Sequence, residues 1–339
     1  MQVSFPPIEV LEAPSDYPAP PGAGGMLFDD IDEQAASLGG WNQRYIQLSA
    51  GVFRGGVQRL LVGGIGLFIE DLQQTVHQTG MVRPDVVALG IPLHFSGESR
   101  FCGQTGSAAE LHVFSGANGF EFHSPKRHVM QGFEIDRPVF DAMFAADDTV
   151  PATAIGLSAG LHTVEQAAAD QLRALGVVLF KWAAHRSGAS GSVVEGRRAH
   201  EALVEKLVTV LDEPLRALGQ PSRPAQHLQA QTLELRARDR VLAQLDQPPT
   251  VAELCHALGV SRRTLQNCIQ ATWGMGPLAW INTLRLNAVR SRLKTATSVT
   301  EAATEFCFWH FGHFSADYRA LFGEPPSATL GRHRCRLAS

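Results

Sequence analysis

The spacing of hydrophobic positions changes near the middle of this 339-residue chain. Between Arg44 and Pro151, short runs rich in β-branched and aromatic residues, such as VVALGIPLHF and FEFHSP, alternate with glycine-containing turns. Short strands at regular spacing are typical of a β-sandwich or barrel. From Leu161 onward, apolar residues recur every three or four positions, which indicates amphipathic helices. The sequence therefore predicts an α+β protein whose strands precede its helices.

Two helices joined by a short polar loop are expected directly after the strands. Residues 161–185 and 196–218 each carry an apolar stripe, and glycines and serines separate them. An antiparallel hairpin of this kind must bury its stripe on the strands, on the next domain or on a second subunit. The segment that follows, GQPSRPAQHLQAQ, has two prolines and few apolar residues, as is typical of a linker.

Charge divides the chain in the same way. The net charge of −4 comes from 29 Lys and Arg against 33 Asp and Glu. From Arg236 onward the counts are 13 against 7, which leaves 16 against 26 for residues 1–235. The C-terminal part thus carries +6 and the remainder −10. Such an asymmetry suggests two domains with different partners, and the basic one is a candidate for nucleic-acid binding.

A helix, a tight turn and a second helix are expected within the basic part. Val251, Leu254 and Leu258 lie on one helical face, Gly259 interrupts the helix, and Ser261 can cap the next one. Arg, Asn and Gln side chains form bidentate contacts with guanine and adenine in the major groove. The polar face of this predicted recognition helix carries Arg262, Arg263, Gln266, Asn267 and Gln270.

The same pattern occurs again 51 residues later, from Ser261 to the matching Gly312. This second unit consists of an inward face within 299–306, a turn at 307–308 and a recognition helix over 309–321. One long helix over 277–294 joins the two units. A rigid connector can present both recognition helices to successive major grooves, about 34 Å apart. The candidate DNA contacts in the second unit are His310, His313, Ser315 and Arg319.

Ordered motifs across residues 240–330 carry a family resemblance. The first unit ends in WGMGP, the second in FGEPP, and between them lie Arg285-Leu286 and Ala288. In these features the chain resembles the AraC/XylS family of transcriptional regulators. The run FWHFGHFSADYRALFGE is similar to the branch that includes ethanolamine-operon and amine-utilisation regulators. Two positions depart from the family pattern, because Cys307 replaces a glycine and Gly312 replaces a frequent serine.

The resemblance implies an N-terminal cupin-like β-barrel with a helical dimerisation hairpin, followed by an all-α domain with two helix-turn-helix units. It implies double-stranded promoter DNA, RNA polymerase and a small effector as partners of a homodimeric activator, and we expect an amine or alcohol as the effector. Arg263, Gln266 and Asn267 would contact bases, while Arg262 and Gln270 would contact phosphates. The expected boundaries are 1–40 for an N-terminal arm, 41–155 for the barrel, 156–218 for the hairpin, 219–235 for the linker and 236–332 for the DNA-binding domain.

Other chemistry has little support in the sequence. There is no H-x-H pair followed by Glu, which cupin metal sites usually require, so we expect no metal and no other cofactor. A barrel enzyme fused to a DNA-binding domain remains an alternative, without assigned catalytic residues. A purely architectural DNA-binding protein would not need the long acidic region. The histidines weighed as metal ligands are His77, His94, His112, His123 and His128.

Aromatic residues of the C-terminal part and the cysteines have simpler interpretations. Helical spacing predicts that the aromatic residues form a core rather than stacking platforms. The five cysteines are widely spaced without a CxxC motif, which favours free thiols in a reducing cytoplasm. No secretory signal and no apolar stretch of membrane-spanning length is expected. The predicted core aromatics are Trp273, Trp280, Phe308, Phe314 and Phe322.

Overall fold

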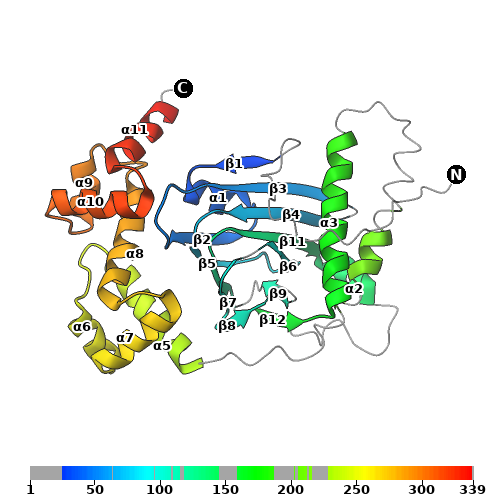
Figure 1. The fold of residues 1–339 in the computed structure, drawn as a ribbon, viewed down its shortest axis with the longest axis horizontal. Coiled ribbons are helices and arrows are strands. Elements are labelled where there is room, and N and C mark those ends of the chain that lie inside the picture. Colours follow the sequence, from blue (N-terminus) through cyan, green and yellow to red (C-terminus); the bar gives the residue numbers. More distant parts are fainter. Residues whose placement is uncertain are drawn as a thin grey trace. The chain divides into compact units, whose positions relative to one another are not determined.

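The computed structural model describes residues 25–339 except 63, 95, 108–109, 115–117, 145–158, 187–201, 203–204, 212–213, 216–227 and 338–339. The chain forms two compact units, drawn in sequence colours in Figure 1. Unit 1 comprises residues 1–45 and 54–224, and unit 2 comprises residues 46–53 and 225–339. Unit 2 is therefore built from two separate stretches of the chain.

Unit 1 is built on two β-sheets. The larger sheet has the order β1-β3-β4-β11-β6-β9-β12 and the smaller one the order β2-β5-β10-β7-β8. The seven strands of the larger sheet are β1 (Met26–Phe28), β3 (Gly55–Val62), β4 (Ile65–Leu72), β11 (His128–Asp136), β6 (Val86–His94), β9 (Glu110–Phe114) and β12 (Gly160–Thr163). The five of the smaller sheet are β2 (Asn42–Gln47), β5 (Val76–Met81), β10 (Phe120–Ser124), β7 (Ser99–Phe101) and β8 (Gln104–Gly106).

The described strands form these two sheets rather than the closed cupin-like barrel that the family resemblance implied. An aromatic core includes residues from both sheets, with Trp41 edge-on to Phe68, Phe114 and Phe120 at centroid distances of 5.5, 4.9 and 5.6 Å. The expectation of a strand-rich N-terminal domain is confirmed, and its closure into a barrel is not.

Helices add a second core to the larger sheet. The long helix α3 (Gln166–Arg186) stands beside the strands in Figure 1. Its buried leucines share one hydrophobic cluster with strand residues and with Leu207, Val210, Leu211 and Leu215. The predicted hairpin thus buries apolar residues of its described parts within unit 1. Two shorter helices of this unit are α1 (Ile31–Ser37) and α2 (Arg137–Phe144).

Three segments fold differently from the expectation. Residues 25–40 hold β1 and α1 instead of a free arm, because β1 pairs with β3 and Asp30 caps α1. Residues 160–163 form β12, since Leu161 is buried and pairs with His112 on β9, so the hairpin starts later than predicted. Residues 228–235 belong to a helix, whereas the rest of the predicted linker, like residues 1–24, lies outside the described part of the chain.

Unit 2 is helical. Thr250 and Glu253 form a reciprocal capping box at the start of the first helix-turn-helix unit, and Gly259 ends that helix in the left-handed conformation. All five predicted core aromatics are buried, which confirms that prediction. The helices are α5 (Leu228–Leu242), α6 (Val251–Leu258), α7 (Arg262–Trp273), α8 (Pro277–Arg292), α9 (Val299–Glu305), α10 (Phe311–Phe322) and α11 (Pro326–Leu337).

The short stretch 46–53 is an integral part of unit 2. The side chain of Asn287 on α8 pairs with the backbone of Gln47, accepting from its N–H at 2.9 Å and donating to its carbonyl at 3.1 Å. The backbone N–H of Gly51 donates to the carbonyl of Leu321 at 2.9 Å. Ile46 is buried in the hydrophobic core of the first helix-turn-helix unit. These contacts join residues more than 200 positions apart in the sequence.

Candidate DNA-binding surface and effector pocket

The first recognition helix, α7, is fixed at both ends and along one face. The Ser261 hydroxyl accepts a hydrogen bond from the Thr264 N–H at 3.1 Å, which confirms Ser261 as the N-cap. Gly274 ends the helix with a φ of 68°. On the inward face, Leu265 and Ile269 are fully buried in the core that also holds Trp273. The helix therefore has a defined orientation and one face that is not used for packing.

All five polar residues predicted on α7 are exposed. They occur at positions i, i+1, i+4, i+5 and i+8, which places them together on one side of the helix, beside the face that buries the leucine and isoleucine. Together they present two guanidinium groups and three carboxamides from one helix. These exposed residues are Arg262, Arg263, Gln266, Asn267 and Gln270.

The turn before the second recognition helix has an unusual backbone at Cys307. Its φ is +59°, a region that favours glycine, which is the residue of the family pattern at this position. The thiol donates to the Asp246 carbonyl at 2.8 Å. Gly312, the second departure, has open space around the position of a Cβ, so no close packing requires a glycine there.

The second recognition helix, α10, presents a different surface. His313 and Arg319 are exposed, His310 is exposed at the N-cap without a side-chain cap, and Ser315 is half-buried. Between the exposed candidates lie three small residues spaced by four positions along the open side of the helix. These are Gly312, Ala316 and Ala320.

Several arginines of the basic domain bind groups within the domain itself. The Arg285 guanidinium donates to the Phe306 carbonyl and lies 4.0 Å from the ring centroid of Phe308. Arg290, which is 1% exposed, pairs with Glu324 at 3.1 Å. Arg292 binds two carboxylates of α9, each at 2.6 Å. Not every basic residue of this part is therefore available to DNA.

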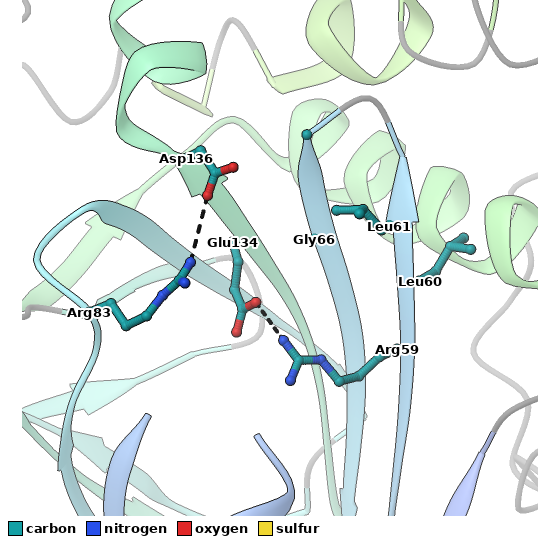
Figure 2. Close-up of a pocket in the computed structure, with 8 residues that line it drawn as sticks. Arg59, Leu60, Leu61, Gly66, Arg83, Glu134 and Asp136 are labelled. Carbon is teal, nitrogen blue, oxygen red and sulfur yellow. Dashed lines mark hydrogen bonds and ion pairs between the residues drawn. The ribbon is translucent and has the colours of Figure 1, made fainter. Parts of the chain in front are cut away.

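Unit 1 contains a pocket of about 360 Å³, shown in Figure 2. At its centre, Glu134 on β11 accepts hydrogen bonds from the Arg59 guanidinium at 2.7 Å and from the Trp41 indole at 2.6 Å. Gly66 is the cross-strand partner of Glu134, and a Cβ there would lie 3.1 Å from its carboxylate. A second pair, Arg83 and Asp136, stands beside the first at 3.7 Å. The full lining is Arg59, Leu60, Leu61, Gly64, Gly66, Arg83, Glu134 and Asp136.

The five N-terminal histidines do not gather in one place. Burial lowers the pKa of His112 to about 4 and that of His128 to about 3, so both are neutral at physiological pH. His112 packs edge-on against Phe101 in the interior. Two others, His77 and His123, instead approach Glu121. The sequence analysis missed this group because strand pairing, not sequence spacing, brings its members together.

Comparison with known proteins agrees with the geometry of unit 2. Residues 254–332 match the family described as "Helix-turn-helix domain". The chain is 35% identical over 98 residues to the probable thc operon regulatory protein of Rhodococcus erythropolis, covering 28% of this chain and 30% of that one. It is 33% identical over 91 residues to XylDLEGF operon transcriptional activator 2 of Pseudomonas putida, covering 26% and 58%. The matched region thus spans less than two thirds of either relative.

Among solved structures, the AraC-like transcriptional activator CuxR aligns over 83% of this chain and 99% of its own, with 14% identity and a TM-score of 0.39. The two helix pairs, α6 with α7 and α9 with α10, and the family match define a double helix-turn-helix domain. The resemblance of this region to AraC/XylS-type regulators, found in the sequence, is thereby confirmed. Within the described residues, no helix combines the length and hydropathy required to cross a bilayer.

Proposed function

We propose that the protein is a sequence-specific transcription regulator, acting as an activator, that binds double-stranded promoter DNA and responds to a small effector. The exposed polar face of α7 carries this proposal. Five side chains with hydrogen-bonding ends project from a helix whose other face is buried, within a domain that matches a DNA-binding family. A helix of this kind fits the major groove, where arginine and carboxamide groups distinguish base pairs.

Within α7 we assign base contacts to Arg263, Gln266 and Asn267, and phosphate contacts to Arg262 and Gln270. The assignment follows the family pattern, and the exposure of all five supports it. In the second unit, Arg319 and His313 are the better placed candidates because both are exposed on the helix body. His310 at the helix start and half-buried Ser315 complete the proposed DNA-contacting set.

We place the effector in the pocket around Glu134. Its two acidic groups are each paired with an arginine, so a ligand with a donor group can take over hydrogen bonds from Glu134 without leaving a buried charge uncompensated. Amines and alcohols carry such donors, and they remain our proposed effector class. An effector changes transcription only if it binds two conformations of the protein with different affinities.

The remaining partners follow from the family resemblance. We propose that the protein acts in the cytoplasm as a homodimer, with the region 161–218 at the dimer contact, and that it activates transcription by touching RNA polymerase. Buried apolar residues of α3 already pack within unit 1, so the dimer contact would use the outer side of this region. Light scattering of the full chain tests the dimer, and a monomer with unchanged DNA affinity would remove that role.

The decisive experiment selects binding sites from random duplex DNA with the full chain and then measures affinity at several salt concentrations. We expect one enriched sequence motif and an affinity that falls steeply with salt, because phosphate contacts release counterions. A folded protein that enriches no motif and binds DNA without salt dependence would refute the proposal.

The effector pocket needs its own test. A thermal-shift screen of small amines and alcohols should raise the unfolding temperature of the native protein, since a ligand at 100 times its Kd adds about 2.7 kcal/mol. Glu134→Gln should abolish the shift. Glu98→Gln is the matched control, because Glu98 is also paired with an arginine in unit 1 but lies outside the pocket. Equal shifts in all three proteins would exclude the pocket.

A further inference from the structure

Two histidines and a glutamate meet on neighbouring strands of the smaller sheet. His77 on β5 and His123 on β10 are direct partners in the antiparallel register, and Glu121 lies two residues before His123 on the same strand face. Their imidazole centroids are 4.4 Å apart. The Nε2 atom of His77 is 2.6 Å from a carboxylate oxygen of Glu121. One ligand atom from each of the three residues lies within 4.8 Å of the other two.

This group is separate from both sites described above. Along β10 the side chains alternate, so Glu121 and His123 point away from the face that Phe120 and Phe122 contribute to the aromatic core. None of the three lines the effector pocket, and none belongs to the helix-turn-helix domain. Even so, the His77 side chain is only 1% exposed and that of Glu121 12%. The group is therefore shielded from solvent without being part of the apolar core.

We propose that His77, Glu121 and His123 form a binding site for a late divalent transition metal ion, with Zn²⁺ as the reference ion. Two imidazoles and one carboxylate are a recurrent ligand set for such ions, whereas Mg²⁺ and Ca²⁺ prefer oxygen ligands throughout. Zinc binds imidazole nitrogen and carboxylate oxygen at about 2.0–2.2 Å. Ligand atoms at the separations seen here can reach these distances through small side-chain rotations.

The hydrogen bond between His77 and Glu121 prepares the site for the ion. It holds an imidazole and a carboxylate oriented toward each other before binding, which lowers the cost of ordering them. The ion would take the place of the proton between His77 Nε2 and Glu121, and the neutral imidazole would then carry its proton on Nδ1. Three protein ligands leave a fourth tetrahedral position for water or a small ligand.

A cation on the neighbouring strand does not prevent this role. Arg100 on β7 is opposite His123 in the register. Its guanidinium, however, forms two hydrogen bonds with Glu98, at 2.9 and 2.6 Å, and so is balanced by its own carboxylate. The bound ion would join β5 to β10 across the strand pair. It would thereby stabilise the smaller sheet whether or not DNA or effector is bound.

The test uses the full chain after treatment with a chelator that is then removed. Calorimetric titration with Zn²⁺ should show one tight site per chain, and Mg²⁺ should not compete for it. Co²⁺, used as a spectroscopic probe in place of Zn²⁺, should give visible absorption bands typical of a site with a low coordination number. Absence of a tight Zn²⁺ site in the folded native chain would overturn the proposal.

Variants locate the site. Glu121→Gln keeps the side-chain shape and His123→Gln removes one ring, and each should weaken Zn²⁺ binding by more than about 100-fold, because even groups one shell further out contribute 10–100-fold. The control is His313→Gln, since His310 and His313 on α10 form another histidine pair, with centroids 6.4 Å apart. Loss of the tight site in the control alone would assign the metal to α10 and refute the proposal.

Protein stability gives a measurement that does not depend on calorimetry. Zn²⁺ should raise the unfolding temperature of the native chain and of the His313 variant, but not that of Glu121→Gln. If His123→Gln does not fold, the Glu121 variant and the native cobalt spectrum still decide the question. A zinc-dependent rise of equal size in the native chain and the Glu121 variant would contradict the assignment.

Discussion

The two helix-turn-helix units share a plan and differ in what their recognition helices expose. On α7, five exposed side chains carry guanidinium or carboxamide groups. On α10, the open side holds Gly312, Ala316 and Ala320, and the exposed polar side chains beside them are His313, Asp317 and Arg319. Since small aliphatic residues offer no hydrogen bonds to base edges, most of the sequence preference should arise from the first unit.

The two units also differ in their internal ion pairs, which among the described residues are more numerous in the second unit. In the second unit, arginines of α8 bind the carbonyl of Phe306 and the carboxylates of Glu301, Glu305 and Glu324. In the first unit, by contrast, Arg262 and Arg263 point to solvent. The arginines of α8 thus bind groups within the domain, whereas Arg262, Arg263 and, in the second unit, Arg319 are exposed, although composition counts them alike.

The largest expected effect is on stability and comes from removing an ion pair in the interior of the second unit. Glu324→Ala leaves the buried Arg290 without its carboxylate and should lower the free energy of unfolding by about 3–5 kcal/mol. Denaturant titration of the full chain measures this. The control is Glu305→Ala, which removes one of two carboxylates from a more exposed arginine and should cost under about 1 kcal/mol. Similar losses in both variants would contradict the difference in burial.

Loss of base contacts in the first unit should come next. Arg263→Ala and Gln266→Ala should each weaken binding to the selected DNA site by about 1–3 kcal/mol and relax the preference at one base pair. Fluorescence anisotropy with matched and single-mismatch duplexes measures both effects. An equal loss on selected and random DNA would instead make these residues phosphate contacts.

The matching change in the second unit should be smaller and less specific. Arg319→Ala should weaken binding to all duplexes alike and reduce the slope of log affinity against log salt by about 1. A salt series with the selected and a random duplex separates this from base recognition. If Arg319→Ala relaxed a base preference as strongly as Arg263→Ala, the two units would contribute equally and the contrast would fail.

The smallest effect is expected at Gly312. A Cβ at this position meets no atom within 4 Å, and its backbone does not need a glycine, so Gly312→Ser should leave stability within about 0.5 kcal/mol or raise it slightly. Because serine adds a hydroxyl beside the proposed DNA surface, DNA affinity should rise modestly. Thermal unfolding and anisotropy of the same preparation check both expectations. A strongly destabilised variant would show that the space is not available.

The sequence predicted the local features of unit 2 well. Ser261, Gly259 and the buried aromatic residues follow from capping rules and helical periodicity, which act over a few residues. Cys307 was flagged by its departure from the family pattern, and its backbone is indeed left-handed. Features set by pairing between distant residues were missed, because hydrophobic periodicity and secondary-structure propensity carry no information on strand register. Examples are β12, the His77 group and the division of unit 1 into two sheets.

The pairing of Gln47 with Asn287 has a consequence for modularity. Because residues 46–53 belong to unit 2, no single cut separates the two units into complete pieces. A chimera that joins a foreign DNA-binding domain at residue 225 would leave the Gln47 backbone facing another side chain in place of Asn287. Exchange of domains between regulators of this design thus requires two matched junctions, so the two units are not freely interchangeable.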